Sequence, residues 1–180
     1  MAVDLFIRTM SHQTALRISL VEASTARWRM EPVKIHWLVD MDIRKARLQA
    51  EEAATSDIYI FNDDDVLPWG KDWTERGLKA MRNNPEFAAC SSRSVVAEER
   101  GNYTIPSGVE ILEVPCVGAP LWMRKGILKD DLPHYLFVSE CVELHNYLRL
   151  RGFKEGIIAG LEHNHLGFGF ATNPELVRGY

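Results

Sequence analysis

The sequence predicts an α/β fold, with one domain built on a mostly parallel central sheet that is flanked by helices. Segments rich in β-branched and aromatic residues alternate with segments of good helix formers through the first half of the chain. Alternation of this kind builds βαβ units, which produce parallel sheets. The chain has 180 residues, of which 46% are hydrophobic, enough for one sizeable core but not for two. We therefore expect a single domain.

The expected strands of the first half are runs of β-formers at residues 3–8, 33–39, 57–61 and 87–90. Helices are expected between them, the first ending before Pro32 and the others covering residues 43–55 and 73–84. Pro68 and Gly70 are expected to turn the chain into the last of these helices. In such a fold, ligands gather outside the carboxyl ends of the strands.

The second half of the chain has a different pattern. Residues 91–120 are interrupted by glycine and proline, which predicts loops with short strands. A helix is expected at residues 138–153, and a short apolar strand follows at residues 156–161.

Composition excludes several classes of protein. A net charge of −4 fits neither a polybasic nucleic-acid binder nor an acidic tail protein. Cys90, Cys116 and Cys141 are odd in number and widely spaced, which favours reduced thiols in a cytoplasmic protein over a disulfide framework. No run approaches the ~20 apolar residues that a membrane span needs, so we expect no membrane span and no secretion signal.

Three consecutive aspartates, Asp63, Asp64 and Asp65, follow the third expected strand directly. A solvated turn is the simplest interpretation, because aspartate favours turns. Their place at the ligand edge of a parallel sheet instead favours a site for Mg²⁺ or Mn²⁺, which bind carboxylates together with substrate phosphates. Side chains alternate along an extended strand, so Asp63 and Asp65 should face the same side and Asp64 the other. Neither an EF-hand nor a phosphate-binding GxxxxGK[ST] loop is present.

The order of these features resembles the family two nucleotide-sugar glycosyltransferases of the GT-A fold. The strongest part is SDIYIFNDDDVLPWGKDWTERGLKAM, which begins at Ser56. The resemblance implies a Rossmann-like GT-A domain that binds a nucleoside-diphosphate sugar together with Mn²⁺ or Mg²⁺, in which Asp63 and Asp65 hold the metal. It also implies a set of nucleotide-sugar-binding residues: Thr9, Asp40, Arg47, Asp63 and Asp64.

The same resemblance places the acceptor in the second half. Glu140 and Glu143 match an acidic segment at a helix start, but Cys141 stands where the family usually has its catalytic base, an aspartate. Glu140 is therefore the expected base, although an acid at that place can also serve only to stabilise the helix N-terminus. Glu143 is expected to contact the acceptor or to lie on the surface. Gly118 and Trp122 are expected to shape the acceptor pocket, with a core tryptophan as the alternative.

Two histidines, His163 and His165, follow the last expected strand beside Glu162. The resemblance implies that one of them completes the metal shell or meets the diphosphate, and the spacing does not choose between them. A structural histidine is the alternative.

These features together predict a metal-dependent, inverting glycosyltransferase. Residues 1–90 would bind the metal and the nucleotide sugar, residues 91–170 would bind the acceptor, and residues 171–180 would form a tail. The acceptor stays open between a glycan, a lipid-linked sugar, a protein and a nucleic-acid base. The alternatives are a nucleotide-sugar-binding module without activity and, less favoured, an aspartate-based phosphotransferase.

Overall fold

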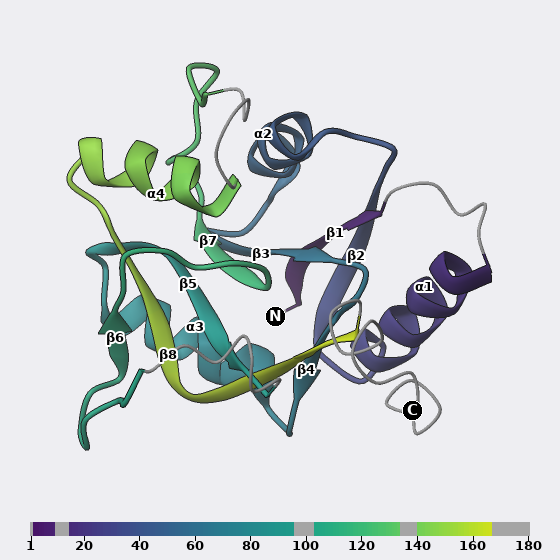
Figure 1. Ribbon diagram of the computed structural model, residues 1–180, viewed down its shortest axis with the longest axis horizontal. Coiled ribbons are helices and arrows are strands. Elements are labelled where there is room, and N and C mark those ends of the chain that lie inside the picture. Colours follow the sequence, from purple (N-terminus) through teal and green to yellow (C-terminus); the bar gives the residue numbers. More distant parts are fainter. Residues whose placement is uncertain (1, 10–14, 96–102, 134–139, 167–180) are drawn as a thin grey trace.

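The structure is a computed structural model that describes residues 2–9, 15–95, 103–133 and 140–166. Within these ranges the chain forms four helices and eight strands (Figure 1). Their order along the chain is β1 (Val3–Thr9), α1 (Ala15–Trp28), β2 (Val33–Val39), α2 (Ile43–Ala53), β3 (Ile58–Asp63), β4 (Val66–Trp69), α3 (Trp73–Asn83), β5 (Phe87–Ser94), β6 (Ile111–Glu113), β7 (Leu121–Arg124), α4 (Glu140–Leu150) and β8 (Lys154–His165). No helix in the described ranges is long and apolar enough to cross a membrane.

The strands form one mixed sheet in the order β2-β1-β3-β7-β5-β8-β4, with β6 paired to β8. β1 pairs in parallel with β2 and β3, and β5 pairs in parallel with β8. β7 runs antiparallel between β3 and β5, while β4 and β6 run antiparallel to β8. The parallel pairs of β1 come from the βαβ units that the sequence predicts, and strands of the second half add most of the antiparallel pairs.

Helices cover both faces of the sheet. One face packs against α2 and α4, whose contributions to a shared core include Ala46, Ala50, Leu144 and Leu148 (Figure 1). The central strands are therefore buried on both sides, and β1 and β3 are buried along almost their whole length. This explains why the middle of each strand, LFI in β1 and IYIF in β3, is apolar without alternation.

The other face packs against α1 and α3 through a group of three tryptophans. Trp28 on α1 meets Trp73 on α3 edge to face, with ring centroids 5.3 Å apart. Trp73 in turn lies 3.8 Å from the centroid of Trp122 on β7. Gly77 on α3 makes this approach possible, because a Cβ there would lie 2.1 Å from the Trp122 ring. All three indoles are fully buried.

β4 was not predicted from the sequence, and two other strands are longer than predicted. Pro68 and Gly70 were expected to turn the chain, yet Val66–Trp69 form an edge strand that tolerates Pro68, because an edge position does not need every backbone donor. β5 runs to Ser94 and β8 spans Lys154–His165, so both continue well beyond their expected ends. Pairing with neighbouring strands extends them through polar sequence that propensity alone does not assign to strands.

Strand register brings the polar residues of distant segments to one edge of the sheet. Arg8 near the end of β1 is the register partner of Asp63 at the end of β3. On the other side, Val66 at the start of β4 is opposite His165 at the end of β8. The aspartate triplet therefore lies between the end of β1 and the end of β8.

Candidate active site

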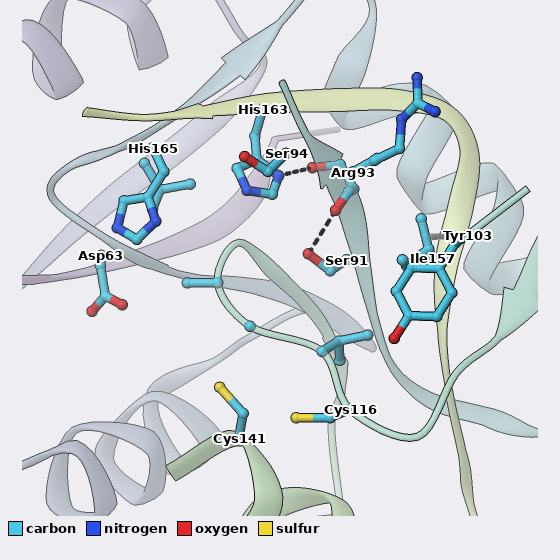
Figure 2. Close-up of a pocket in the computed structure, with 15 residues that line it drawn as sticks. Asp63, Ser91, Arg93, Ser94, Tyr103, Cys116, Cys141, Ile157, His163 and His165 are labelled. Carbon is cyan, nitrogen blue, oxygen red and sulfur yellow. Dashed lines mark hydrogen bonds between the residues drawn. The ribbon is translucent and has the colours of Figure 1, made fainter. Parts of the chain in front are cut away.

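A pocket of about 410 Å³ lies beside the end of β3 (Figure 2). It is bounded by the ends of β3, β5 and β8, by the segment before β7 and by the first turn of α4. The residues that line it are Asp63, Val66, Ser91, Ser92, Arg93, Ser94, Tyr103, Cys116, Val117, Gly118, Ala119, Cys141, Ile157, His163 and His165. The wall combines hydroxyl groups, imidazoles and a carboxylate, which suits a polar ligand.

Asp63 is the last residue of β3 and its carboxylate is partly exposed to the pocket. The guanidinium of Arg8 lies 3.4 Å from Asp63 Oδ1, and Arg8 Nε donates to the backbone carbonyl of Met41. One arginine thus links the end of β1, the segment before α2 and the aspartate. Its positive charge favours the ionised form of the Asp63 carboxylate.

Asp64 has the opposite environment, because it is only 1% exposed. Thr9 donates its hydroxyl to Asp64 Oδ2 over 2.5 Å, and the Asp64 amide donates to the carbonyl of Arg8. Both side chains of the Thr9–Asp64 pair are buried, so the pair fastens the end of β1 to the turn between β3 and β4. The donor-binding role expected for these two residues stays a prediction.

Asp65 lies close to His165, with Oδ2 and Nε2 3.4 Å apart. The backbone carbonyl of Asp65 also accepts from the amide of Leu166, which holds the two chain segments together. Since β4 and β8 are paired, this approach follows from the register of the sheet. The two groups form an ion pair when the imidazole is protonated.

His163 faces a different partner. Its Nδ1 forms a 2.8 Å hydrogen bond with Ser92 Oγ, and the residue is only 6% exposed (Figure 2). The sequence left the two histidines equivalent, whereas the structure puts His165 beside an aspartate and His163 beside a buried serine. His165 is therefore the better candidate for a metal ligand, and the ligand role of His163 stays a prediction.

The donor set of this edge suits a hard divalent cation in its chemistry. Asp63, Asp65 and His165 offer carboxylate oxygens and an imidazole nitrogen, which are ligands that Mn²⁺ accepts. Among the residues that the structure describes, no three histidine, cysteine, aspartate or glutamate side chains are already arranged as a metal site. Asp65 and His165 are the pair already close together, while Asp63 lies against Arg8.

Two other predicted donor residues lie outside the pocket lining. Asp40 follows β2 with a left-handed backbone, φ 52°, and is exposed, while its amide donates to the carbonyl of Thr9. Arg47 on α2 is 3% exposed and lies over the Phe61 ring at 5.8 Å. Asp40 is thus accessible to a ligand at the sheet edge, whereas Arg47 acts from within the core.

The predicted acceptor residues separate into two groups. Gly118 lines the pocket. Glu143 is half-buried on α4 outside the pocket lining, and Trp122 has no exposed surface because it belongs to the core. That burial agrees with the alternative interpretation of Trp122 as a core tryptophan. Glu140 begins α4, and its side chain lies outside the described part of the structure.

A buried carboxyl, Glu155, lies near the part of the pocket that Cys141 lines. Glu155 on β8 is 2% exposed, and its Oε2 is 2.7 Å from His145 Nδ1. Its other oxygen, Oε1, has no hydrogen-bond partner among the described residues. Burial raises the pKa of Glu155 to about 8, the negative charge of Cys141 adds to this rise, and Arg47 opposes it. The carboxyl therefore titrates near pH 8.

Several residues of this site were not predicted from the sequence. Arg8 interrupts the apolar run of the first strand, and a charged residue at the carboxyl end of a buried strand is a usable signal. Ser92 and Tyr103 gave no signal, because they fall in a segment without periodicity. Cys116 and Cys141 are 25 positions apart in the sequence, and only the fold brings both to one pocket.

Comparison by sequence finds no relatives: no protein-family model matches the chain, and no curated protein matches it. Comparison by structure finds similar proteins. A197 from STIV superposes with a TM-score of 0.58 at 18% identity, over 92% of this chain and 85% of that one.

Two further similar structures were crystallised with nucleotides. GalNAc-T7 with UDP, GalNAc and Mn²⁺ gives a TM-score of 0.57 at 10% identity, over 91% of this chain and 43% of that one. S. aureus TarS 1-349 with UDP-GlcNAc gives 0.51 at 13% identity, over 93% of this chain and 61% of that one. The present chain therefore spans less than two thirds of either protein. At these identities the likeness establishes a shared GT-A-like α/β fold.

Proposed function

We propose that this chain is a glycosyltransferase that moves a sugar from a nucleoside-diphosphate sugar to an acceptor hydroxyl. The observation that carries the proposal is that Asp63 and His165 line the pocket at the end of β3, with Asp65 3.4 Å from His165. Solved proteins of the same fold hold UDP, GalNAc and Mn²⁺ in one case and UDP-GlcNAc in another. Carboxylates at a pocket with hydroxyl-bearing walls suit a diphosphate sugar and its cation.

Asp65 and His165 would hold Mn²⁺ or Mg²⁺, with Asp63 as a further ligand. The pair already lies close, at 3.4 Å, and its donor atoms suit such a cation. When bound, a divalent cation stabilises the negative charge that builds on the leaving diphosphate.

The remaining donor residues act mainly by holding this edge in place. Arg8 orients Asp63, and the buried Thr9–Asp64 pair fixes the backbone on which Asp63 and Asp65 stand. Asp40 is exposed at the end of β2 and binds the nucleoside. Arg47 supplies positive charge from the core, which favours an anionic ligand in the nearby pocket.

The acceptor enters over the segment before β7 and the first turn of α4. Gly118 leaves room there, and Glu140 removes the proton of the acceptor hydroxyl as it attacks the sugar. A base on the acceptor side, opposite the leaving diphosphate, gives inversion of configuration. Support for this placement is the position of Glu140, one residue before the pocket-lining Cys141. Glu143 contacts the acceptor farther out.

Donor hydrolysis tests the proposal without knowledge of the acceptor. The full chain should release UDP from UDP-GlcNAc or UDP-GalNAc when Mn²⁺ is present, and Asp65→Asn should remove that release while the unfolding temperature changes little. Asp72→Asn is a matched control, because Asp72 is exposed, makes no capping hydrogen bond and has a left-handed backbone that asparagine tolerates. Equal release by the wild type and Asp65→Asn would overturn the proposed role of the carboxylates.

A binding module without turnover is the second candidate function. It is favoured by a specific observation: the residue of α4 that lines the pocket is a thiol, Cys141, rather than a carboxylate. Binding of UDP-GlcNAc with Mn²⁺, without UDP release and without transfer to any acceptor, would support the module. Loss of transfer in Glu140→Gln with donor binding intact would exclude it.

A further inference from the structure

Two of the three cysteines meet at the acceptor side of the pocket. Cys116 lies in the segment between β6 and β7, and Cys141 lies in the first turn of α4. Both line the pocket, and Figure 2 shows their side chains next to each other at the side away from His163 and Arg93. Cys90, on β5, is fully buried elsewhere in the core.

The two thiols interact directly. A side-chain hydrogen bond to Cys141 raises the pKa of Cys116, burial and the negative charge of Cys141 add to the rise, and Arg47 opposes it. Cys116 therefore keeps its proton over a wider pH range than an ordinary thiol. Cys141 belongs to the first turn of a helix, a position that favours a thiolate. We therefore assign the first attack to Cys141.

We propose that Cys116 and Cys141 are a site of reversible disulfide formation, which ties the first turn of α4 to the segment that precedes β7. Both groups are half-buried rather than enclosed, so a small oxidant can reach them from the pocket. The elements that they join are the two walls of the acceptor side.

The reaction needs a low-molecular-weight disulfide such as oxidised glutathione. The Cys141 thiolate attacks one sulfur of the oxidant, forms a mixed disulfide and expels one glutathione thiolate, which takes up a proton. The Cys116 sulfur then attacks the Cys141 sulfur, expels the second glutathione and gives up its proton to it. Two protein thiols are oxidised, and one glutathione disulfide is reduced to two thiols.

The second step is made easier by the first. Once Cys141 carries the mixed disulfide, it no longer bears the negative charge that raises the pKa of Cys116. Cys116 can then lose its proton at a lower pH. The arrangement thus favours attack by Cys141 first and closure by Cys116 second.

The crosslink should affect transfer rather than donor binding. This part rests on the proposed function, because Asp63, Asp65 and His165 belong to the sheet edge, whereas the sulfurs belong to the two acceptor walls. The covalent step itself is independent of any activity.

The test uses the full chain incubated with oxidised glutathione and then mapped by mass spectrometry without reduction. We expect a protein lighter by two hydrogen atoms and a linked pair of peptides that contain Cys116 and Cys141, restored to free thiols by dithiothreitol. The unfolding temperature of the oxidised wild type should rise by roughly 5–10 °C.

Cys116→Ser should instead keep glutathione on Cys141, and Cys141→Ser should show no crosslink. Cys90 is the internal control and should stay unmodified.

A wild type that carries glutathione on a single cysteine, or that stays fully reduced while a reference dithiol is oxidised, would overturn the proposal. So would a disulfide that involves Cys90. Failure of the proposed function looks different: the linked peptides would still form, but UDP-GlcNAc with Mn²⁺ would neither bind nor be hydrolysed. If the disulfide forms and transfer is unchanged, the expected effect of the crosslink on transfer is contradicted.

Discussion

The proposed donor and acceptor sides of the pocket differ in how their polar side chains are paired. On the donor side the groups hold one another: Arg8 holds Asp63, Thr9 holds Asp64, and Asp65 lies beside His165. On the acceptor side two thiols and a buried carboxyl, Glu155, share one region, and burial raises the pKa of the carboxyl. The groups at the end of β3 are therefore held in place, whereas the α4 side carries a carboxyl whose charge depends on pH and the thiol pair for which we propose oxidation.

The largest expected difference between the two sides is the pH dependence of folding stability that Glu155 causes. Its pKa in the folded chain is about 8, against 4.5 for the ordinary group, so the folded state binds more protons than the unfolded state between these values. Stability should thus fall as pH rises from about 4.5 to 8, by an amount on the order of 4 kcal/mol for this group. Chemical denaturation at several pH values measures the slope.

Glu155→Gln should flatten that slope while keeping the neutral-pH fold. Glu113→Gln is the matched control, because Glu113 pairs with Lys154 at the surface. A slope that survives in Glu155→Gln would assign the pH dependence to other groups.

Removal of the buried donor-side carboxylate should have the next largest effect. Asp64→Ala leaves the buried Thr9 hydroxyl without its acceptor and should lower the free energy of unfolding by about 3 kcal/mol. Urea denaturation measures the loss, with Asp57→Ala as an exposed control. In a double-mutant cycle with Thr9→Val the two losses should not add. Additive losses would mean that the two side chains do not interact.

Substitution of the two histidines should affect different properties, activity for His165 and stability for His163. His165→Ala should reduce Mn²⁺-dependent UDP release by about 10–100-fold with little change in stability, since a metal ligand is lost. His163→Ala should instead lower the unfolding free energy by about 1–2 kcal/mol, because it breaks a buried hydrogen bond to Ser92. Kinetic and denaturation measurements on both variants test these different roles. Equal losses of UDP release in the two variants would contradict them.

Gly118→Ala should give the smallest change in stability, and Gly77→Ala is its contrasting control. In Gly118→Ala the new Cβ would lie 3.7 Å from Cys141 Sγ, an ordinary contact, so stability should change by less than about 1 kcal/mol. Transfer to an acceptor should still weaken, because the methyl group enters the pocket. Gly77→Ala puts a Cβ 2.1 Å from the Trp122 ring and should cost about 3 kcal/mol instead. Similar losses in both variants would argue against an open acceptor side.

The position of the aspartates at the end of β3 was predictable from the sequence, whereas the arrangement of the pocket near α4 was not. Asp63–Asp65 follow an apolar strand directly, so local pattern and the rule for parallel sheets place them at the ligand edge. β4 escaped prediction because a four-residue edge strand that contains Pro68 looks like a turn. The choice between His163 and His165 needed the register of β8 against β4, which is a long-range property. The contact between Cys116 and Cys141 likewise depends on where α4 packs.

The donor site can be tested most directly by ligand-dependent thermal unfolding of the full chain with UDP-GlcNAc and UDP-GalNAc, each with and without Mn²⁺. A ligand that binds only the folded state at 100 times its Kd adds about 2.7 kcal/mol of stability. We predict a rise in the unfolding temperature with at least one donor, dependent on Mn²⁺ and absent in Asp65→Asn. An unchanged unfolding temperature with every nucleoside-diphosphate sugar, or an equal rise in Asp65→Asn, would contradict a metal-assisted donor site at the end of β3.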